Sequence, residues 1–168
     1  VEALGRTKSD GSKLFGVRVR DPRVTTRIED AGVTAFDYDP KWRIPGVFHP
    51  TAPVDFEADT VEAGVRESTP RIGTFSFELN GKTYELVLIG KETATGIQPV
   101  AHVRDLTSGP TTYGAGRVIE LHYTDATCKR IDWIDFNYAV ALPCAFTNFV
   151  TCPLAPPDCM WRPAFPLF

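Results

Sequence analysis

Two charged residues flank a loop that is rich in glycine and hydroxyl groups. Asp105 ends the run AHVRD, Arg117 begins the run RVIELHY, and the segment 106–116 between them reads LTSGPTTYGAG. Side chains alternate between the two faces of a strand, so Asp105 shares a face with the apolar Ala101 and Val103. The same alternation turns Arg117 inward on the next strand. We therefore expect the carboxylate and the guanidinium to reach each other at the base of the loop.

Two interpretations of this pair are open. In one, Asp105 and Arg117 form a partly buried ion pair that pins the loop, because an unpaired charge there would be costly. In the other, the loop binds a small anionic or polar ligand, since an arginine fork binds carboxylates and Gly114 and Gly116 let backbone N–H groups approach. The second interpretation predicts these ligand-binding residues: Thr107, Thr112, Tyr113, Gly114, Arg117 and Asn137. The loop lacks the Gly-Lys-Ser/Thr ending of a P-loop.

A second polar group lies in the run RIDWIDFNYA. Alternation places Asp135 and Asn137 on one face together with Ile131 and Trp133, while the other face also carries apolar residues. A strand with apolar residues on both faces is expected to be central in its sheet. Buried polar side chains need hydrogen-bond partners, and Arg117, loop N–H groups or a ligand would supply them. The alternative is that these two side chains support the C-terminal tail.

The same residues allow an enzymatic hypothesis. A hydrolase would use Asp105 or Asp135 as its general base and Arg117 to stabilise a developing oxyanion. That chemistry requires a carboxylate that is free to take a proton, and an aspartate locked against Arg117 would be a poor base. Whether the protein is an enzyme therefore stays open at this level.

The cysteines and histidines do not have the spacing of a metal site. Cys144 and Cys152 are eight residues apart and Cys159 follows seven later, whereas structural zinc sites use C-x₂₋₄-C. We expect free thiols, a structural role for Cys144 and Cys152, no metal and no cofactor. His102 and His122 alternate onto the face opposite the expected core, which predicts solvated side chains.

The surrounding sequence predicts a mainly β protein. Eleven Phe against one Met favour strands, and 14 Pro with 13 Gly add turns. Alternating runs such as FGVRVR, WRIPGVF and VDFEA read as short strands, and TFSFEL and KTYELVLI flank Asn80-Gly81, the dipeptide of a type I′ hairpin. Further strands are expected over 98–105, 116–123 and 130–140. The segment 23–32 reads as a short helix ended by Gly32.

The predicted architecture is a single antiparallel β-barrel or sandwich over 15–168, preceded by a flexible arm over 1–14 and containing at most one or two short helices. After Pro143 the sequence is rich in proline, which denies it helix interiors and central strands. The same tail holds many apolar residues, so it is expected to cover part of the sheet. A third functional hypothesis follows, in which this tail contacts another chain or a second copy as a homodimer.

Charge and hydropathy exclude several partners. The formal net charge of 168 residues is -3 and no Lys/Arg run is present, so nucleic-acid binding has no electrostatic basis. No stretch approaches the roughly 20 apolar residues of a membrane-spanning helix, and the start VEALGRTKSDGSK has no signal-peptide core. We therefore expect a cytoplasmic protein without membrane partners.

Four stretches of the sequence resemble the DUF1684 family of uncharacterised bacterial and archaeal proteins. They are FDYDPKWRI, RIGTFSFELNGKTYELVLI, RDLTSGPTTYGAGR and IDFNYAVALPCAFTNFVTCPLAPP, and the resemblance extends from about Val17 to Pro157. No established activity comes with this family. The resemblance implies that its motif is densest at these positions: Asp105, Thr107, Gly109, Thr112, Tyr113, Gly114, Arg117, Asp135, Asn137, Cys144 and Cys152. Two departures lie in the tail, where ALPCAF and DCMWRPAFPLF differ from the expected pattern.

Overall fold

The computed structural model describes residues 1–21, 23 and 37–155. Within them the chain forms nine strands and three single-turn 3-10 helices. The strands are β1 (Glu2–Thr7), β2 (Lys13–Arg18), β3 (Arg43–Asp59), β4 (Arg66–Leu79), β5 (Lys82–Thr93), β6 (Gly96–Val103), β7 (Arg117–Glu120), β8 (Trp133–Asp135) and β9 (Val140–Ala141). The 3-10 helices are η2 (Pro40–Trp42), η3 (Phe136–Tyr138) and η4 (Pro143–Ala145). The helix expected over 23–32 falls, apart from Arg23, outside the described residues.

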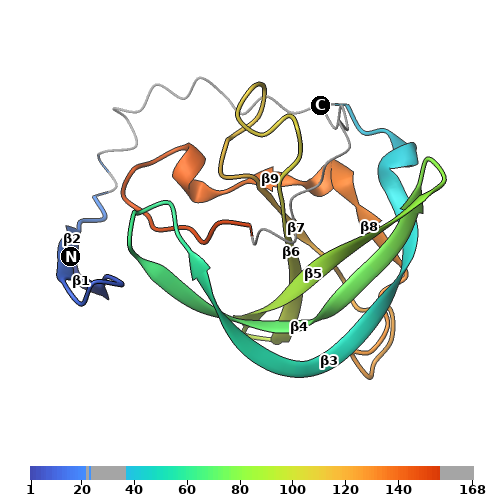
Figure 1. Cartoon of the computed structure of the whole chain (residues 1–168), viewed down its shortest axis with the longest axis horizontal. Coiled ribbons are helices and arrows are strands. Elements are labelled where there is room, and N and C mark those ends of the chain that lie inside the picture. The colour runs from blue at the N-terminus through green and yellow to red at the C-terminus, as the bar shows by residue number, and fades with distance from the viewer. Residues whose placement is uncertain (22, 24–36, 156–168) are drawn as a thin grey trace.

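Seven strands form one antiparallel sheet in the order β8-β3-β4-β5-β6-β7-β9 (Figure 1). The two edge strands are neighbours in the chain, because only η3 and Ala139 separate β8 from β9. Five residues span at most about 18 Å, so the sheet curls until its edges come near each other. The predicted mainly β, antiparallel class is confirmed, and the sheet is not closed into a barrel.

The expectation of a single strand over 130–140 was wrong. β8 pairs with β3 through Arg43↔Asp135, whereas β9 pairs with β7 through Arg117↔Ala141, at the opposite edge of the sheet. The strand breaks because the Asp135 carboxylate accepts a hydrogen bond from the Asn137 backbone N–H at 3.1 Å and caps η3. Aspartate favours such local turns over the regular ladder.

The runs WRIPGVF and VDFEA are not separate strands: apart from Trp42, which ends η2, they belong to the single strand β3, which bends around the bottom of the domain in Figure 1. The pairing of β3 with β4 shifts register between Pro50 and Val54. Proline removes a backbone donor from the ladder, and a bulge absorbs that loss without ending the strand. The interruption between the two runs in the sequence therefore corresponds to a bulge within one strand.

The β4–β5 hairpin is confirmed as predicted. Asn80 and Gly81 both have positive φ, 52° and 73°, as a type I′ turn requires. Phe75 is paired with Leu86, and Phe77 with Tyr84, so the expected apolar faces coincide. The core is built on this face from fully or nearly buried residues: Ile44, Phe48, Ile72, Phe75, Phe77, Leu86, Leu88, Ala101, Val103, Ile119, Leu121, Ile131, Ile134 and Phe136.

The segment 142–155 covers the opposite face of the sheet, as the apolar content of the tail predicts. Val87 of β5 packs on Ala155, and Val118 of β7 packs against a buried cluster of Leu142, Cys144 and Cys152. This second layer overturns one expectation: His102 is buried, although it does alternate away from the core. The pattern places a side chain on a face but does not reveal what covers that face.

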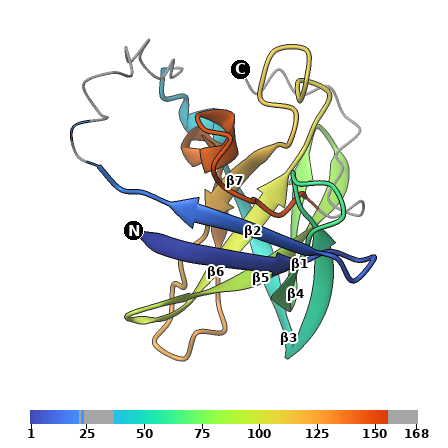
Figure 2. The ribbon, with the colours of Figure 1, turned by 90° about the vertical axis from the view of Figure 1, so that its left-hand side faces the viewer.

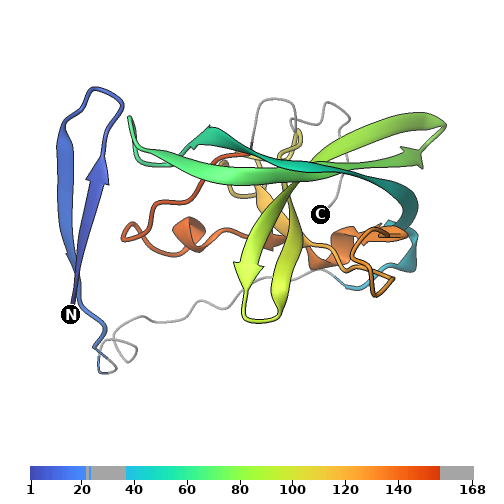
Figure 3. The ribbon, with the colours of Figure 1, turned by 90° about the horizontal axis from the view of Figure 1, so that it is seen from below.

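The N-terminal strands β1 and β2 form a separate two-stranded sheet that stands beside the main domain (Figures 2 and 3). Its register runs from Glu2↔Arg18 to Thr7↔Lys13. Among the described residues, its backbone contacts with the main domain are made at its turn, where the Ser9 N–H donates to the Gly64 carbonyl at 2.7 Å. The first 14 residues thus include one complete strand of this hairpin.

Candidate functional site

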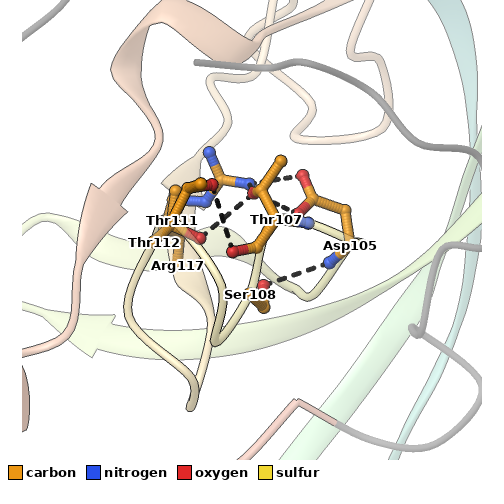
Figure 4. Close-up of polar contacts among 6 residues, drawn as sticks. All are labelled: Asp105, Thr107, Ser108, Thr111, Thr112 and Arg117. Atoms are coloured by element: carbon orange, nitrogen blue, oxygen red, sulfur yellow. Dashed lines mark hydrogen bonds and ion pairs between the residues drawn. The ribbon is translucent and has the colours of Figure 1, made fainter.

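The sequence-predicted pair forms at the base of the 106–116 loop (Figure 4). The Arg117 Nη2 atom donates to the Asp105 Oδ2 atom at 2.5 Å, and the two side chains are only 6% and 4% exposed. A charge-assisted bond of this kind is strengthened by the low dielectric of its surroundings. Burial also makes each charge dependent on the other.

Strand pairing brings the two residues together. β6 ends at Val103, whose register partner is Arg117 at the start of β7, so the chain leaves and re-enters the sheet at adjacent positions. Gly116 adopts a φ of +97°, and a Cβ atom there would collide with the Val103 carbonyl oxygen and lie 2.7 Å from Arg104 Cγ. Glycine is therefore required where the loop returns to the sheet.

Loop hydroxyls complete the network around the carboxylate. Asp105 Oδ1 accepts from the Thr107 N–H at 2.8 Å and from the Thr107 hydroxyl at 2.5 Å. The Thr107 and Thr112 hydroxyls are 3.1 Å apart, and the Ser108 hydroxyl accepts from the Asp105 N–H at 3.2 Å (Figure 4). Thr107 Oγ1 also lies 3.5 Å from Arg117 Nη2. Both carboxylate oxygens are thus engaged, Oδ1 by Thr107 of the loop and Oδ2 by Arg117 at the start of β7.

This arrangement limits what the pair can do chemically. The Asp105 carboxylate occupies the position beside Arg117 that an external anion would take. A general base needs an oxygen free to accept a proton from a substrate, and Asp105 presents neither oxygen free. The geometry favours a structural pin over a catalytic dyad.

Asp135 and Asn137 belong to a different network. Asn137 Nδ2 donates to the Asp39 carbonyl at 3.0 Å and to Asp135 Oδ1 at 2.8 Å, while Asn137 Oδ1 accepts from the Asp39 N–H at 3.0 Å. The Tyr38 hydroxyl lies 3.4 Å from Asp135 Oδ2. Among the described residues no hydrogen bond or ion pair joins this group to Arg117. Residues 38–39 thus supply partners that the local sequence pattern did not predict.

Tyr113 leaves the loop and packs on the cysteine pair. It contacts the cluster of Leu142, Cys144 and Cys152 under the 142–155 segment. A hydrogen bond with the Cys144 thiol, and then burial, raises the pKa of Tyr113 to about 12. Burial, and then a hydrogen bond with the Cys144 side chain, raises the pKa of Cys152 to about 11. Tyr113 is therefore an anchor of the second layer rather than a group on the loop surface.

Gly114, His122 and His49 each have separate surroundings. Gly114 has room for a Cβ atom, which would meet only Gly109 Cα at 3.8 Å. His122 is exposed, and His49 bonds to the Ser76 hydroxyl at 2.9 Å. In the part of the chain that the structure describes, no three His, Cys, Asp or Glu side chains gather as a metal site, and no helix could span a membrane.

A groove of about 460 Å³ between the β1–β2 hairpin and residues 148–151 was not foreseen. Its walls carry apolar side chains, including Leu4, Leu14, Phe15 and Phe149, with Arg18 and Glu62 among the charged ones. The sequence signal that could have revealed it is the alternation in KLFGVRVR, which places three large apolar residues on one face. Of these, Phe15 and Val17 are 78% and 69% exposed.

Comparisons with known proteins agree with the fold and supply no activity. The solution NMR structure of an uncharacterized protein from Haloarcula marismortui superposes with a TM-score of 0.64 at 24% identity, covering 86% of this chain and 78% of that one. No curated protein matches the chain. The model of a family described as "Protein of unknown function (DUF1684)" matches residues 30–160. The chain therefore belongs to the DUF1684 family.

Proposed function

We propose that this domain is a non-catalytic interaction module that pairs with a second copy of itself through the β1–β2 hairpin. The observation that carries the proposal is the apolar, solvent-exposed surface of that hairpin, which stands beside the domain next to an apolar groove. Contiguous exposed apolar surface bordered by charges is typical of protein interaction sites.

The β1–β2 hairpin has few partners to stabilise it in water. An isolated two-stranded sheet is marginally stable, and an unpaired strand edge is a template for pairing with another chain. Among the described residues, the Lys8–Glu62 ion pair at the same turn, whose atoms lie 3.8 Å apart, adds to the backbone contacts with the domain. Addition of further strands would stabilise it.

The charges of the two edges favour β1 as the pairing edge. β2 begins with Lys13, ends with Arg18 and carries no acidic residue, whereas β1 contains Glu2 and Arg6. If two β1 strands pair antiparallel with Leu4 opposite its symmetry mate, each Glu2 lies opposite the Arg6 of the other copy. The same interface is then used by both copies, as a two-fold dimer requires.

The resulting four-stranded sheet has consistent faces. On one face, Glu2 of each copy lies between its own Arg18, 3.4 Å away, and the other copy's Arg6. On the other face, Phe15 and Val17 of both copies surround the small residues of the two β1 strands. Opposite charges and apolar pairs facing across strands each stabilise a sheet.

The hydrolase alternative has less support from the geometry. Asp105 is held by Arg117 and Thr107, and Asp135 is held by Asn137 and Tyr38. Neither carboxylate is placed as a free base. Both carboxylates bind groups of the protein itself.

The experiment is sedimentation velocity on charge variants of β1. Arg6→Glu and Glu2→Arg each place like charges across the interface, and each should weaken self-association by about tenfold or more. Mixing the two variants restores both opposite-charge pairs, so the mixture should associate again. A wild-type chain that stays monomeric at every accessible concentration, or a mixture that does not recover, overturns the proposal.

A pair of apolar variants provides the matched control. Val17→Asp puts a charge on the exposed face of the hairpin and should weaken association, whereas Val54→Asp, at a site that is 61% exposed on β3, should not. Equal effects of the two substitutions would show that association does not use the hairpin. Circular dichroism checks that both variants remain folded.

A second candidate function is binding of a small anionic or polar ligand at the 106–116 end of the sheet. One observation favours it: Arg104 Nε is buried and has no hydrogen-bond partner, and a buried donor of this kind is costly. The exposed Thr111 hydroxyl and the open space at Gly109 lie on the same loop.

Thermal shift with phosphate, sulfate and small dicarboxylates tests this candidate. A stabilising anion should lose its effect in Arg104→Leu and keep it in Arg130→Leu, an exposed control. If no anion of the panel raises the melting temperature of the wild type, or if both variants respond alike, this candidate is rejected.

A further inference from the structure

The two buried cysteines of the second layer are held in place from separate directions. Cys144 lies in η4, whose Ala145 N–H donates to the Leu142 carbonyl at 2.9 Å. Cys152 is fixed to the end of β3, because its carbonyl accepts from the Val61 N–H at 3.0 Å and the next residue, Pro153, bridges to Thr60. Backbone hydrogen bonds thus fix the positions of both cysteines.

Both thiols belong to one apolar cluster. Cys144 and Cys152 are both buried and share the cluster with Leu142. Burial in this cluster and the neighbouring Cys144 side chain both raise the pKa of the Cys152 thiol. The chain between them, 145–151, loops out to the surface and exposes Phe146 and Phe149. Two buried thiols that share one cluster and close a nine-residue loop are therefore candidates for a disulfide.

We propose that Cys144 and Cys152 are an oxidisable dithiol that closes to an intramolecular disulfide with an oxidant of the disulfide class, such as glutathione disulfide. This inference does not rest on the proposed dimer. It assigns a modification site to the loop 145–151, which carries one wall of the groove.

The reaction balances by two thiol–disulfide exchanges. One cysteine thiolate attacks a sulfur of glutathione disulfide, forms a mixed disulfide and releases one glutathione thiolate. The second cysteine thiolate then attacks the protein sulfur of the mixed disulfide and releases the second glutathione thiolate. Two protein thiols are oxidised, one glutathione disulfide is reduced, and the two thiol protons pass to the released glutathione thiolates at neutral pH.

Burial controls the rate of this reaction. The attacking form is the thiolate, and the Cys152 thiol is held in its protonated form by its surroundings. The oxidant also reaches the pair only when the 145–151 loop opens. Oxidation of the folded protein should therefore be slow at neutral pH and faster at alkaline pH, while oxidation during refolding should be rapid.

The experiment uses the full chain with Cys128→Ser and Cys159→Ser, which leaves only the pair. The protein is unfolded, refolded in a glutathione redox buffer and digested with chymotrypsin, which cleaves after Phe146 and Phe149 between the two cysteines. Mass spectrometry should find the two fragments linked until dithiothreitol is added. The oxidised protein should melt roughly 5 to 10 °C higher than the reduced protein.

Two further variants make the result decisive. Cys144→Ser or Cys152→Ser in the same background leaves one thiol, which should stop at a glutathione adduct. If the protein with both cysteines also stops at a glutathione adduct, or returns two free thiols after refolding, the proposal is wrong. A linked product that lowers the melting temperature would equally overturn it, because the native positions would then not fit a disulfide.

Discussion

Replacing Asp105 by Asn removes one charge of the buried ion pair and preserves the shape of the side chain. The Oδ1 contacts with Thr107 can be kept, but the Arg117 guanidinium loses the carboxylate that lies 2.5 Å from Nη2. Both side chains are less than a tenth exposed, so water cannot replace the missing partner. The substitution therefore removes a negative charge that lies directly against the buried Arg117 guanidinium.

The expected cost follows from that burial. Breaking a buried pair by removing one partner costs about 3 to 5 kcal/mol. In a domain of this size each kcal/mol lowers the melting temperature by about 2 to 4 °C, so Asp105→Asn should melt roughly 6 to 20 °C lower. Such a loss is a large part of the roughly 5 to 15 kcal/mol of a folded domain.

Urea unfolding followed by tryptophan fluorescence measures this cost, with Asp132→Asn as the control. Asp132 bonds to Arg130 at 2.6 Å, but that pair is 34% and 69% exposed, so its loss should cost under about 1 kcal/mol. Removing both buried charges, in Asp105→Leu/Arg117→Met, should cost less than Asp105→Asn alone. Equal losses in Asp105→Asn and Asp132→Asn would refute the assignment of the pair as a structural pin.

Two other perturbations test the loop and the second layer. Gly116→Ala should destabilise the domain by about 1 to 3 kcal/mol, because of its positive φ and the Val103 carbonyl, whereas Gly114→Ala should change little; urea unfolding compares them. Burial lowers the pKa of His102 from 6.5 to about 4, so the unfolded chain takes up a proton first as the pH falls. Stability is full above pH 6.5 and should decrease by about 3 kcal/mol between pH 6.5 and 4; urea unfolding of His102→Gln should lack this loss, and the exposed control His122→Gln should retain it.

The parts of the fold that the sequence predicts are those decided by neighbours along the chain. Asn80-Gly81 fixes the β4–β5 turn by itself, and two-residue alternation then determines which side chains enter the core. The same alternation places Asp105 and Arg117 inward on strands that adjoin at Val103↔Arg117. This ion pair could be predicted because only 11 residues separate its two charges.

The parts that the sequence does not predict depend on distant segments. Asn137 is satisfied by Asp39, which lies 98 positions away, and no local pattern selects that partner. His102 is buried because the 142–155 segment lies over its face of the sheet, although alternation alone leaves that face to solvent. One local signal was present and was outweighed by periodicity: Asp135, two residues before Asn137, is an N-cap that ends the strand.

The charged side chains of the two polar networks bind partners within the fold. Asp105, Arg117 and Thr107 hold the loop between β6 and β7, and Asp135 with Asn137 caps the turn that links the two edges of the sheet. These charges lie at strand ends, where an open sheet has backbone groups to satisfy, and their partners come from within the fold. The hairpin is different, because Phe15 and Val17 face solvent and, within the described residues, its small sheet consists of β1 and β2 alone. A surface of that kind is completed by another chain more readily than by a substrate, since it offers strand edges and apolar area but no reacting group.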